Sequence, residues 1–389
     1  MAKLIEITGK ALSGEWGIDD QTGEGIPVLR TTNFTNEGVV DYKNVVTRTI
    51  TKKNIEEKFL RKGDIIIEKS GGSDKFPVGR VIYFEGEDNT YLFNNFTGLL
   101  RVKNQEIWYP RYVFYSLFAN YRRGGTRMFE NKTTGIHNLK LAHYISQYEV
   151  NEIVKEEQIS VCDKLDKLYV IINEMKQQLR LLDDLIKARF VEMFGIPLDE
   201  SKANMRFTDC VEFNPEKSEV KDMQNVEVSF IPMECVGVDG SFNIRENGPV
   251  SNYYKGYTYF RDGDVLLAKI TPCFENGKAA IAEGCKNGIG FGTTEFHVAR
   301  PKAGVSNSYW IKYLLKNDSV HDLATINMTG SAGQKRIQTS FFEKLIIFCP
   351  PIQLQNQFAD FVRQVDKSKL MFQKLHQKLN ILQQKAGDI

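Results

Sequence analysis

A chain of 389 residues that is 42% hydrophobic and carries 25 Phe and 16 Tyr predicts two packed domains, because a single core rarely supports this length. The composition excludes a disordered or low-complexity protein. With 51 basic and 49 acidic residues the formal net charge is +2, so the total charge gives no argument for a nucleic-acid partner.

The first ten residues, MAKLIEITGK, lack the apolar run and the cleavage site of a signal peptide. No stretch of the chain approaches the roughly 18 uncharged apolar residues that cross a bilayer. We therefore expect a cytoplasmic protein. Its six cysteines are scattered without a CxxC pair, which indicates reduced thiols rather than a zinc site or a disulfide framework.

A segment of the first half of the chain recurs in the second half. RKGDIIIEKSGGSDKFPVGRVIYF, at 61–84, predicts a strand, a polar loop and a second strand, and RDGDVLLAKITPCFENGKAAIAE from Arg261 repeats the pattern. Three residues of the first copy return 200 positions later: Gly63, Asp64 and Lys69 as Gly263, Asp264 and Lys269. The two predicted domains should therefore have related folds.

Each half opens with short apolar runs divided by Gly and Asn, at 26–34 and 229–238, which predict strands. One helix is expected in each half, from Pro110 and from Ser308, again about 200 residues apart. Both halves are therefore expected to be α+β.

Apolar residues in three-four alternation follow Val161 and are typical of a coiled-coil seam. The first seam consists of Leu165, Leu168, Ile172, Met175, Leu179, Leu182 and Ile186. Subtracting 200 from the C-terminal segment gives the equivalent seam of Val365, Phe372, Leu375, Leu379, Leu382 and Ala386, with Ser368 opposite Leu168. The pattern predicts two long antiparallel helices; the alternative is that each seam packs its helix onto a globular core.

Gly195 and Pro197 are expected to end the first long helix, and Pro350 with Pro351 to precede the second. The predicted fold is α+β, with two tandem globular domains separated by two long antiparallel coiled-coil helices and a pseudo-two-fold internal repeat. The predicted segments are a first globular domain, a central helix, a second globular domain and a C-terminal helix, at 1–150, 151–196, 197–350 and 351–389.

Basic residues gather in equivalent parts of both halves. Between 101 and 140 there are eight Lys or Arg against two acidic residues, and between 300 and 336 there are six against two. A repeated surface that binds a polyanion would have this distribution, and so would a solvated face. Two basic domains on a rigid helical spacer would match a split DNA sequence, because equivalent elements of dimeric DNA readers lie about 34 Å apart.

The order of these segments resembles the specificity subunit of Type I restriction-modification enzymes, the HsdS family, over essentially the whole chain. LSGEWGIDDQTGEGIPVLRTTNFTNEG at 12–38 is similar to the opening of a target recognition domain in this family, and RKGDIIIEKSGGS and RDGDVLLAKITPC to its recurring strand. TTGIHNLKLAHYISQYEV and GSAGQKRIQTSFFEKLIIFCPP resemble the segments that lead into the conserved helices. EEQISVCDKLDKL and LQNQFADFVRQVDK resemble the openings of those helices, and LIKARFVEMFG the end of the central one.

This resemblance implies that the chain binds double-stranded DNA and selects the sequence, while catalysis lies on other subunits. Two modification subunits that carry S-adenosylmethionine would methylate adenine, and two motor-nuclease subunits would use ATP and magnesium. The long helices are the expected docking surface for the modification subunits. No cofactor or metal is expected on this chain.

Motifs for chemistry on this chain are weak. GIGFG at 288–292 precedes a strand-like segment where a cofactor loop should open a helix, and no GxxxxGK[ST] loop exists. Asp64, Glu68 and Lys69 suggest a nuclease site, but the alternation of a strand would point Glu68 and Lys69 to opposite faces, and the second half has Ala268 at the matching position. A structural strand edge is the better interpretation.

Candidate DNA contacts follow from residue type. Arg suits guanine and Asn suits adenine in the major groove, whereas clustered Lys and Arg suit phosphates. The candidates of the first half are Arg30, Thr31, Thr32, Asn33, Lys69, Lys75, Arg80, Arg122, Arg123, Arg127 and Lys132, and those of the second half are Lys269, Lys278, Lys335 and Arg336.

The sequence therefore predicts a non-catalytic DNA-recognition subunit that reads a bipartite site. A coiled-coil scaffold whose end domains bind proteins is the first alternative, and an enzyme with its own catalytic domain is the second. Salt titration separates the first two, because a DNA reader that contacts several phosphates loses affinity steeply with added salt.

Overall fold

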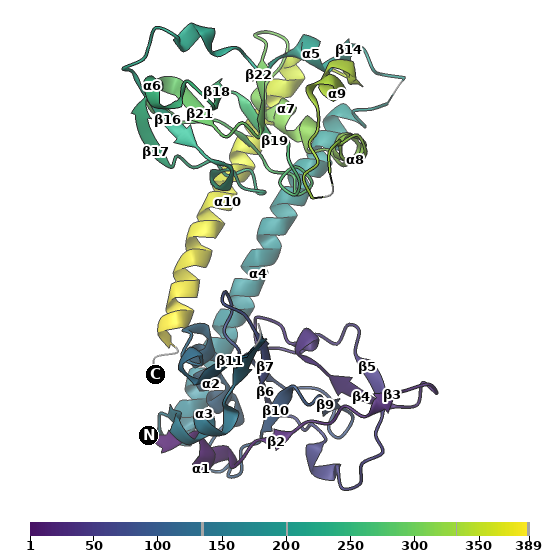
Figure 1. Cartoon of the computed structure of the whole chain (residues 1–389), viewed down its shortest axis with the longest axis vertical. Helices are drawn as coiled ribbons and strands as arrows, with labels where there is room; N and C mark the ends of the chain where they lie inside the picture. The colour runs from purple at the N-terminus through teal and green to yellow at the C-terminus, as the bar shows by residue number, and fades with distance from the viewer. Residues whose placement is uncertain (134–135, 200, 332, 387–389) are drawn as a thin grey trace. The chain divides into compact units, whose positions relative to one another are not determined.

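A computed structural model describes residues 1–133, 136–199, 201–331 and 333–386, without the side chains of 132, 133, 136 and 380–386. The chain divides into two compact units (Figure 1). Unit 1 consists of Met1–Lys176 with the end of the chain from Lys374, and unit 2 of Gln177–Gln373. The boundary between the two units falls inside the long helix α4 (Lys155–Phe194). The domain boundaries predicted from the sequence lie near the ends of that helix, and they remain a prediction.

Unit 1 is built on two four-stranded sheets and a smaller third one. The first has the order β2-β10-β6-β8 and is antiparallel: Leu12–Ser13, Thr97–Leu100, Ile65–Glu68 and Val81–Tyr83. The second has the order β3-β5-β4-β9, and its β4–β9 pair is parallel: Ile18–Asp19, Val46–Thr49, Ile26–Leu29 and Leu92–Phe93. The third has the order β11-β12-β7: Glu130–Thr133, Ile136–Leu139 and Ser70–Gly72.

Helices α1 (Leu4–Thr8), α2 (Pro110–Arg122) and α3 (Leu141–Gln147) complete unit 1, with a short pair of β1 (Ala2–Lys3) and β13 (Glu149–Val150). The helix predicted from Pro110 is confirmed.

Strand β6 explains why the repeated segment is apolar at successive positions. Ile65 and Ile67 pack in one buried cluster with residues of α2, and Ile66 packs in a second cluster on the other face. Successive residues of a strand point to opposite faces, so a strand covered on both faces has no polar alternation. In unit 2, Val265 and Leu267 pack in one buried cluster and Leu266 packs in another.

Unit 2 repeats the antiparallel sheet and the parallel strand pair of the mixed sheet. Its antiparallel sheet has the order β15-β22-β19-β20: Val211–Phe213, Phe296–Pro301, Val265–Ala268 and Ala279–Ile281. Its mixed sheet has the order β17-β16-β21-β18, with β16 and β21 parallel: Glu246–Pro249, Glu227–Ile231, Ile289–Gly292 and Thr258–Arg261. A short pair joins β14 and β23: Met205–Arg206 and Ile346–Ile347.

The helices of unit 2 are α5 (Phe207–Cys210), α6 (Val250–Tyr253), α7 (Ser308–Leu315), α8 (Asp318–Ile326) and α9 (Thr339–Lys344). The prediction of a helix from Ser308 is confirmed. The internal repeat predicted from the 200-residue displacement is a repeat of fold.

A buried ion pair lies behind the repeated Gly-Asp. Asp64 is 2% exposed, and Arg101 donates to both of its carboxylate oxygens, from Nε at 2.7 Å and from Nη2 at 2.6 Å. In unit 2, Arg300 donates to both oxygens of Asp264 at 2.9 Å. Gly263, with φ of 91°, makes the left-handed turn before that carboxylate. The motif is therefore structural in both units.

Two long helices appear where the apolar seams predicted them. Helix α4 ends at Phe194, before Gly195, and α10 spans Ile352–Ala386. Within the described residues, no helix is both long enough and apolar enough to cross a bilayer.

In unit 2 the two long helices lie side by side and antiparallel (Figure 1). Phe358 packs edge-on against Phe190 at 5.5 Å and Phe194 at 5.4 Å, and Lys369 Nζ donates to Asp183 Oδ1 at 2.6 Å. Later residues of α10 therefore contact earlier residues of α4, as in an antiparallel pair. Phe190, Phe194 and Phe358 also belong to the globular core of unit 2, so the helices pack both on each other and on the core.

The predicted seam residues lie at different depths. Leu165, Ile172 and Met175 are buried in unit 1, and Val365 is buried in unit 2. Leu168, Leu179, Leu182, Phe372 and Leu379 are partly buried. Leu375 is 44% exposed, and the side chain of Leu382 lies outside the described residues. Direct pairing of these residues across the two helices remains a prediction.

A fully buried glutamine fastens the first turn of each long helix to its unit. The Gln158 amide accepts from Tyr109 N and donates to Ile107 O and Ile153 O, all at 2.8 to 2.9 Å. The Gln355 amide accepts from Asn307 N and donates to two carbonyls in the same way. The sequence resemblance between the two helix openings thus has a physical basis.

Candidate nucleic-acid interface

The turn after β4, Arg30–Asn33, was predicted to read bases. Asn33 is 2% exposed, accepts from Arg30 N at 3.0 Å and donates to the carbonyls of Asp41 and Lys43. Arg80 donates to Thr31 O and Phe34 O, both at 2.9 Å. Asn33 and Arg80 therefore build the turn.

The side chain that this turn leaves exposed is Thr32, while Arg30 and Thr31 are partly buried. Arg30 donates from Nη2 to Asn44 O at 3.1 Å. Base contact by any of these residues remains a prediction, and the structure favours Thr32 on grounds of access.

Lys69 lies at the end of β6, partly buried, and its Nζ donates to Ser13 Oγ at 3.2 Å. Burial and the nearby Lys58 cation lower the pKa of Lys69. The adjacent Glu68 is 5% exposed, and burial raises the pKa of its carboxyl against the opposing effect of Arg80, 3.7 Å away. A buried carboxylate beside an arginine fits the predicted strand edge better than a nuclease site.

The loop between β7 and β8 is held by Arg127, whose Nη2 donates to Asp74 O at 3.1 Å and Lys75 O at 3.2 Å. Val78 N donates to Glu130 Oε1 at 3.0 Å on the other side of the loop. Lys75 is exposed at the tip. A basic side chain is thus presented on a braced loop.

At the end of α2, Arg122 and Arg123 are both exposed. The side chain of Lys132 lies outside the described residues. Among the residues that the structure describes, Lys75 and Arg122 form no ion pair with a carboxylate, so their charge is available to a phosphate.

The candidate DNA contacts of unit 2 also include both cations bonded within the fold and an exposed cation. Arg336 donates to Glu295 from Nε and Nη2 at 2.8 to 3.2 Å, which neutralises its charge within the fold. Lys278 Nζ donates to Met233 O at 3.2 Å, and Lys269 is partly buried. Lys335 is exposed in the loop before Arg336.

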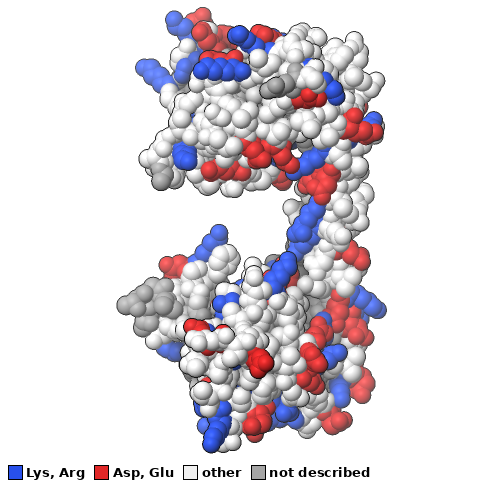
Figure 2. Space-filling view, turned by 90° about the vertical axis from the view of Figure 1, so that its right-hand side faces the viewer, with Lys and Arg blue, Asp and Glu red and all other residues white. Residues whose placement is uncertain are grey.

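The basic excess between 101–140 and 300–336 overstates the charge that faces solvent. Arg101 and Arg300 belong to the buried ion pairs, and Arg111 pairs with Asp166 and Glu85. Figure 2 shows basic and acidic side chains interspersed over each unit on the face turned to the viewer. The available cations are therefore local to loop tips and helix ends.

Comparison with known proteins identifies a domain in the second half of the chain. Residues 219–383 match the family described as "Type I restriction modification DNA specificity domain". The chain carries a Type I specificity domain. The resemblance stated from the sequence is confirmed for this part of the chain.

The chain also has curated relatives from Escherichia coli. The chain is 41% identical over 205 residues to the Type I restriction enzyme EcoEI specificity subunit and 43% identical over 183 residues to the EcoAI specificity subunit. These matches cover 52% and 44% of this chain but 32% and 30% of the relatives, so the chain spans about a third of the length of the curated relatives it matches.

The fold of the chain recurs in solved structures. The S subunit of a Type I restriction-modification system from M. genitalium superposes with a TM-score of 0.54 at 13% identity, over 99% of this chain and 94% of that chain. At this identity the likeness concerns the fold, and it confirms the predicted α+β architecture.

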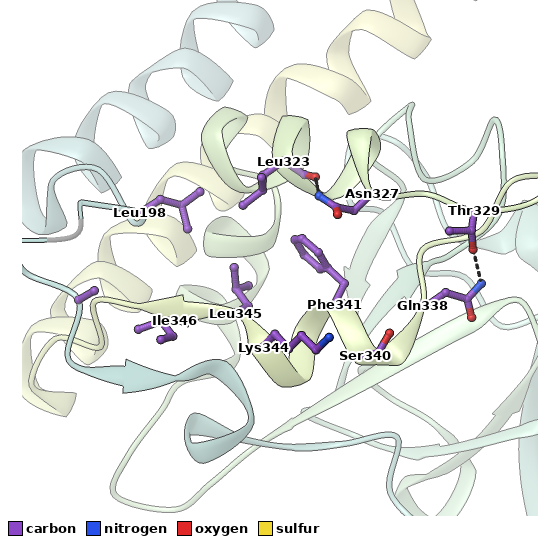
Figure 3. A pocket seen from close by; sticks show the side chains of 11 residues that line it. Leu198, Leu323, Asn327, Thr329, Gln338, Ser340, Phe341, Lys344, Leu345 and Ile346 are labelled. Atoms are coloured by element: carbon purple, nitrogen blue, oxygen red, sulfur yellow. Dashed lines mark hydrogen bonds between the residues drawn. The ribbon is translucent and has the colours of Figure 1, made fainter.

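A metal site and a ligand groove are the alternatives to a DNA-binding surface. No group of three or more His, Cys, Asp or Glu within the described ranges could hold a metal ion. An open groove of about 810 Å³ in unit 2 is shown in Figure 3, where Leu198, Leu323, Phe341 and Leu345 point toward one another. Its lining holds one cation, Lys344, beside these apolar side chains, so it lacks the clustered Lys and Arg of an extended phosphate-binding surface.

His297 is a buried residue that bonds to the backbone next to Arg336. Its Nε2 donates to Ile337 O at 2.9 Å, and Ile337 N donates in turn to Lys269 O at 3.0 Å. Burial lowers the pKa of His297 to about 4. The ring is therefore neutral in the folded state at neutral pH.

Acidification should destabilise unit 2 through His297. Because the folded-state pKa lies below the ordinary value, the unfolded state takes up the proton first, so stability falls as the pH drops from about 6.5 to about 4, by up to about 3 kcal/mol. Urea unfolding of wild type and His297→Gln at several pH values measures the difference, since the two proteins share all their carboxylates. An identical pH dependence of the two proteins would contradict this role.

Sequence reasoning missed the partners of several arginines. The Arg101–Asp64 and Arg336–Glu295 pairs join residues 37 and 41 positions apart. A usable signal for the first pair existed, because an arginine follows the repeated Asp at nearly the same distance in both halves.

Proposed function

We propose that this chain is the DNA-recognition subunit of a Type I restriction-modification complex and that each unit reads one half of a split duplex site. The observation that carries the proposal is the duplicated fold, in which the buried Asp–Arg pair and the mixed sheet occur once in each unit, together with the specificity domain matched at 219–383. Two related readers on one chain suit a target with two parts.

The outward faces of the long helices suit protein partners. Several large apolar residues of α4 are 44% to 51% exposed: Val170, Ile171, Leu181, Leu185 and Val191. Exposed apolar residues gathered on one helix are typical of interaction surfaces. We assign them to the docking of two modification subunits that carry S-adenosylmethionine, with two motor-nuclease subunits supplying ATP- and magnesium-dependent steps in the cytoplasm. On this proposal the chain itself is not catalytic.

Methylation-site mapping tests the proposal. The chain is produced with the modification subunit of its own system in a host that lacks other adenine methylation, and the modified positions are read across the genome. The expected result is one sequence in two parts with an unread gap. Cells with the modification subunit alone are the control and should show no such sequence. A continuous site would overturn the bipartite reading, and absence of methylation, with a purified complex that binds no duplex, would favour the protein scaffold.

A further inference from the structure

Unit 1 carries an exposed aromatic ring at the tip of a basic loop. Phe76, in the loop between β7 and β8, is 57% exposed, and the neighbouring turn presents Met128 at 81% exposure. Arg127 joins the two segments through its bonds to the carbonyls of Asp74 and Lys75. Large apolar side chains and cations are thus placed together on one surface.

The loop is rigid around this ring. Ser73 N donates to Phe76 O at 2.7 Å, and Phe76 N donates back to Ser73 Oγ at 3.1 Å. The Lys75 ammonium lies 5.3 Å from the Phe76 ring. The one carboxylate of the loop, Asp74, lies 3.6 Å from His137 Nε2. The loop therefore holds the ring out before any partner arrives, which reduces the entropy lost on binding.

Unit 2 buries the corresponding ring. Phe274, in the loop that follows β19, is 1% exposed and stacks on His321 of α8 with ring centroids 5.0 Å apart. His321 also donates to Phe274 O at 2.9 Å. Exposure of Phe76 is therefore a property of unit 1 and not of the repeated fold. Burying such a ring would stabilise a complex by removing its apolar surface from water.

We propose that Phe76 is an apolar wedge that enters the base stack of the half-site bound by unit 1 and kinks it, while unit 2 reads its half-site without a wedge. The inference rests on the proposed function. An inserted apolar side chain partly unstacks a base step, and the bend brings phosphates toward the cations that flank it. Lys75 lies against the ring and Arg127 bonds to the backbone of the same loop, so two cations flank the wedge where those phosphates would come. Phe76 thus makes the specificity of unit 1 depend on how easily the sequence deforms.

Fluorescence of 2-aminopurine tests the wedge on the mapped site. The full chain with its modification subunit is bound to duplexes that carry the probe at successive steps of each half-site. The wild type should raise the fluorescence at one step of one half-site, and Phe76→Ala should abolish that signal and weaken binding about tenfold or more. Phe76→Trp should keep both. A flipped methylation target would also fluoresce, but that signal belongs to the modification subunit and should persist in Phe76→Ala.

Ile107→Ala is the matched control. Ile107 is 51% exposed and lies before the other end of α2, a helix of 13 residues and about 20 Å from the cations at its C-terminus. This variant should bind and fluoresce as the wild type does. Binding of the mapped site with no enhanced step, or a Phe76→Ala complex of unchanged affinity, overturns the wedge and leaves the proposed function standing. Failure of the wild-type complex to bind any duplex overturns the proposed function itself.

Discussion

Replacing Asp264 by Ala lowers the free energy of unfolding of unit 2 by about 3–5 kcal/mol, because it leaves the partly buried Arg300 guanidinium without its bidentate partner. Arg300 retains Glu219 at 3.3 Å and Glu212 at 3.6 Å, both more exposed than Asp264, so part of its charge stays compensated. Asp264 also accepts from Arg261 N at 2.8 Å, and this donor loses its partner too. Asp64→Ala should destabilise unit 1 by a comparable amount.

Hydrogen exchange followed by mass spectrometry separates the two effects, since each substitution should accelerate exchange in its own unit. Asp360→Ala removes the exposed Arg363–Asp360 pair on α10 and should change the stability by less than about 1 kcal/mol. Equal acceleration in both units after either substitution would show that the units do not unfold separately. A loss no larger than that of Asp360→Ala would show that the repeated Asp–Arg pair does not hold the fold.

The fold could be predicted because its signals are local. Apolar periodicity placed the long helices at α4 and α10, and the displaced Gly-Asp motif predicted the repeat. The reason for that motif could not be predicted, because Asp64 and Arg101 meet only when β6 pairs with β10. Composition counts Arg101 as a surface cation, whereas the pairing of the strands makes it the partly buried partner of the buried Asp64 carboxylate.

Residue type alone could not tell DNA contacts from residues that hold the fold, because the partners of each side chain are set by tertiary structure. Asn33 and Arg80 have the chemistry of base readers, yet both are bonded to the backbone of the turn that they build. Phe76 and Phe274 occupy corresponding loops with opposite exposure. The difference lies in α8, which covers the loop of unit 2 through His321 and has no helical counterpart among the described residues of unit 1.

Duplex binding should weaken by about a thousandfold between about 50 and about 200 mM salt, because the cations that neutralise phosphates release condensed counterions. The structure divides the predicted contacts into those that should contribute and those that should not. Lys75, Arg122 and Lys335 are exposed without a carboxylate partner within the described part of the chain, so Lys75→Gln, Arg122→Gln and Lys335→Gln should each reduce the logarithmic salt slope by about one.

The double substitution Arg336→Gln with Glu295→Gln is the control for that series. It removes one cation together with the anion that already neutralises it, so the slope should be unchanged even if the fold loses stability. Fluorescence anisotropy with the mapped duplex at five or more salt concentrations gives the slopes, and circular dichroism confirms that each variant is folded. A slope that falls as much for the neutral pair as for Arg122→Gln would mean that Arg336 leaves Glu295 to reach a phosphate. A slope that no variant changes would place the DNA on another surface of the two units.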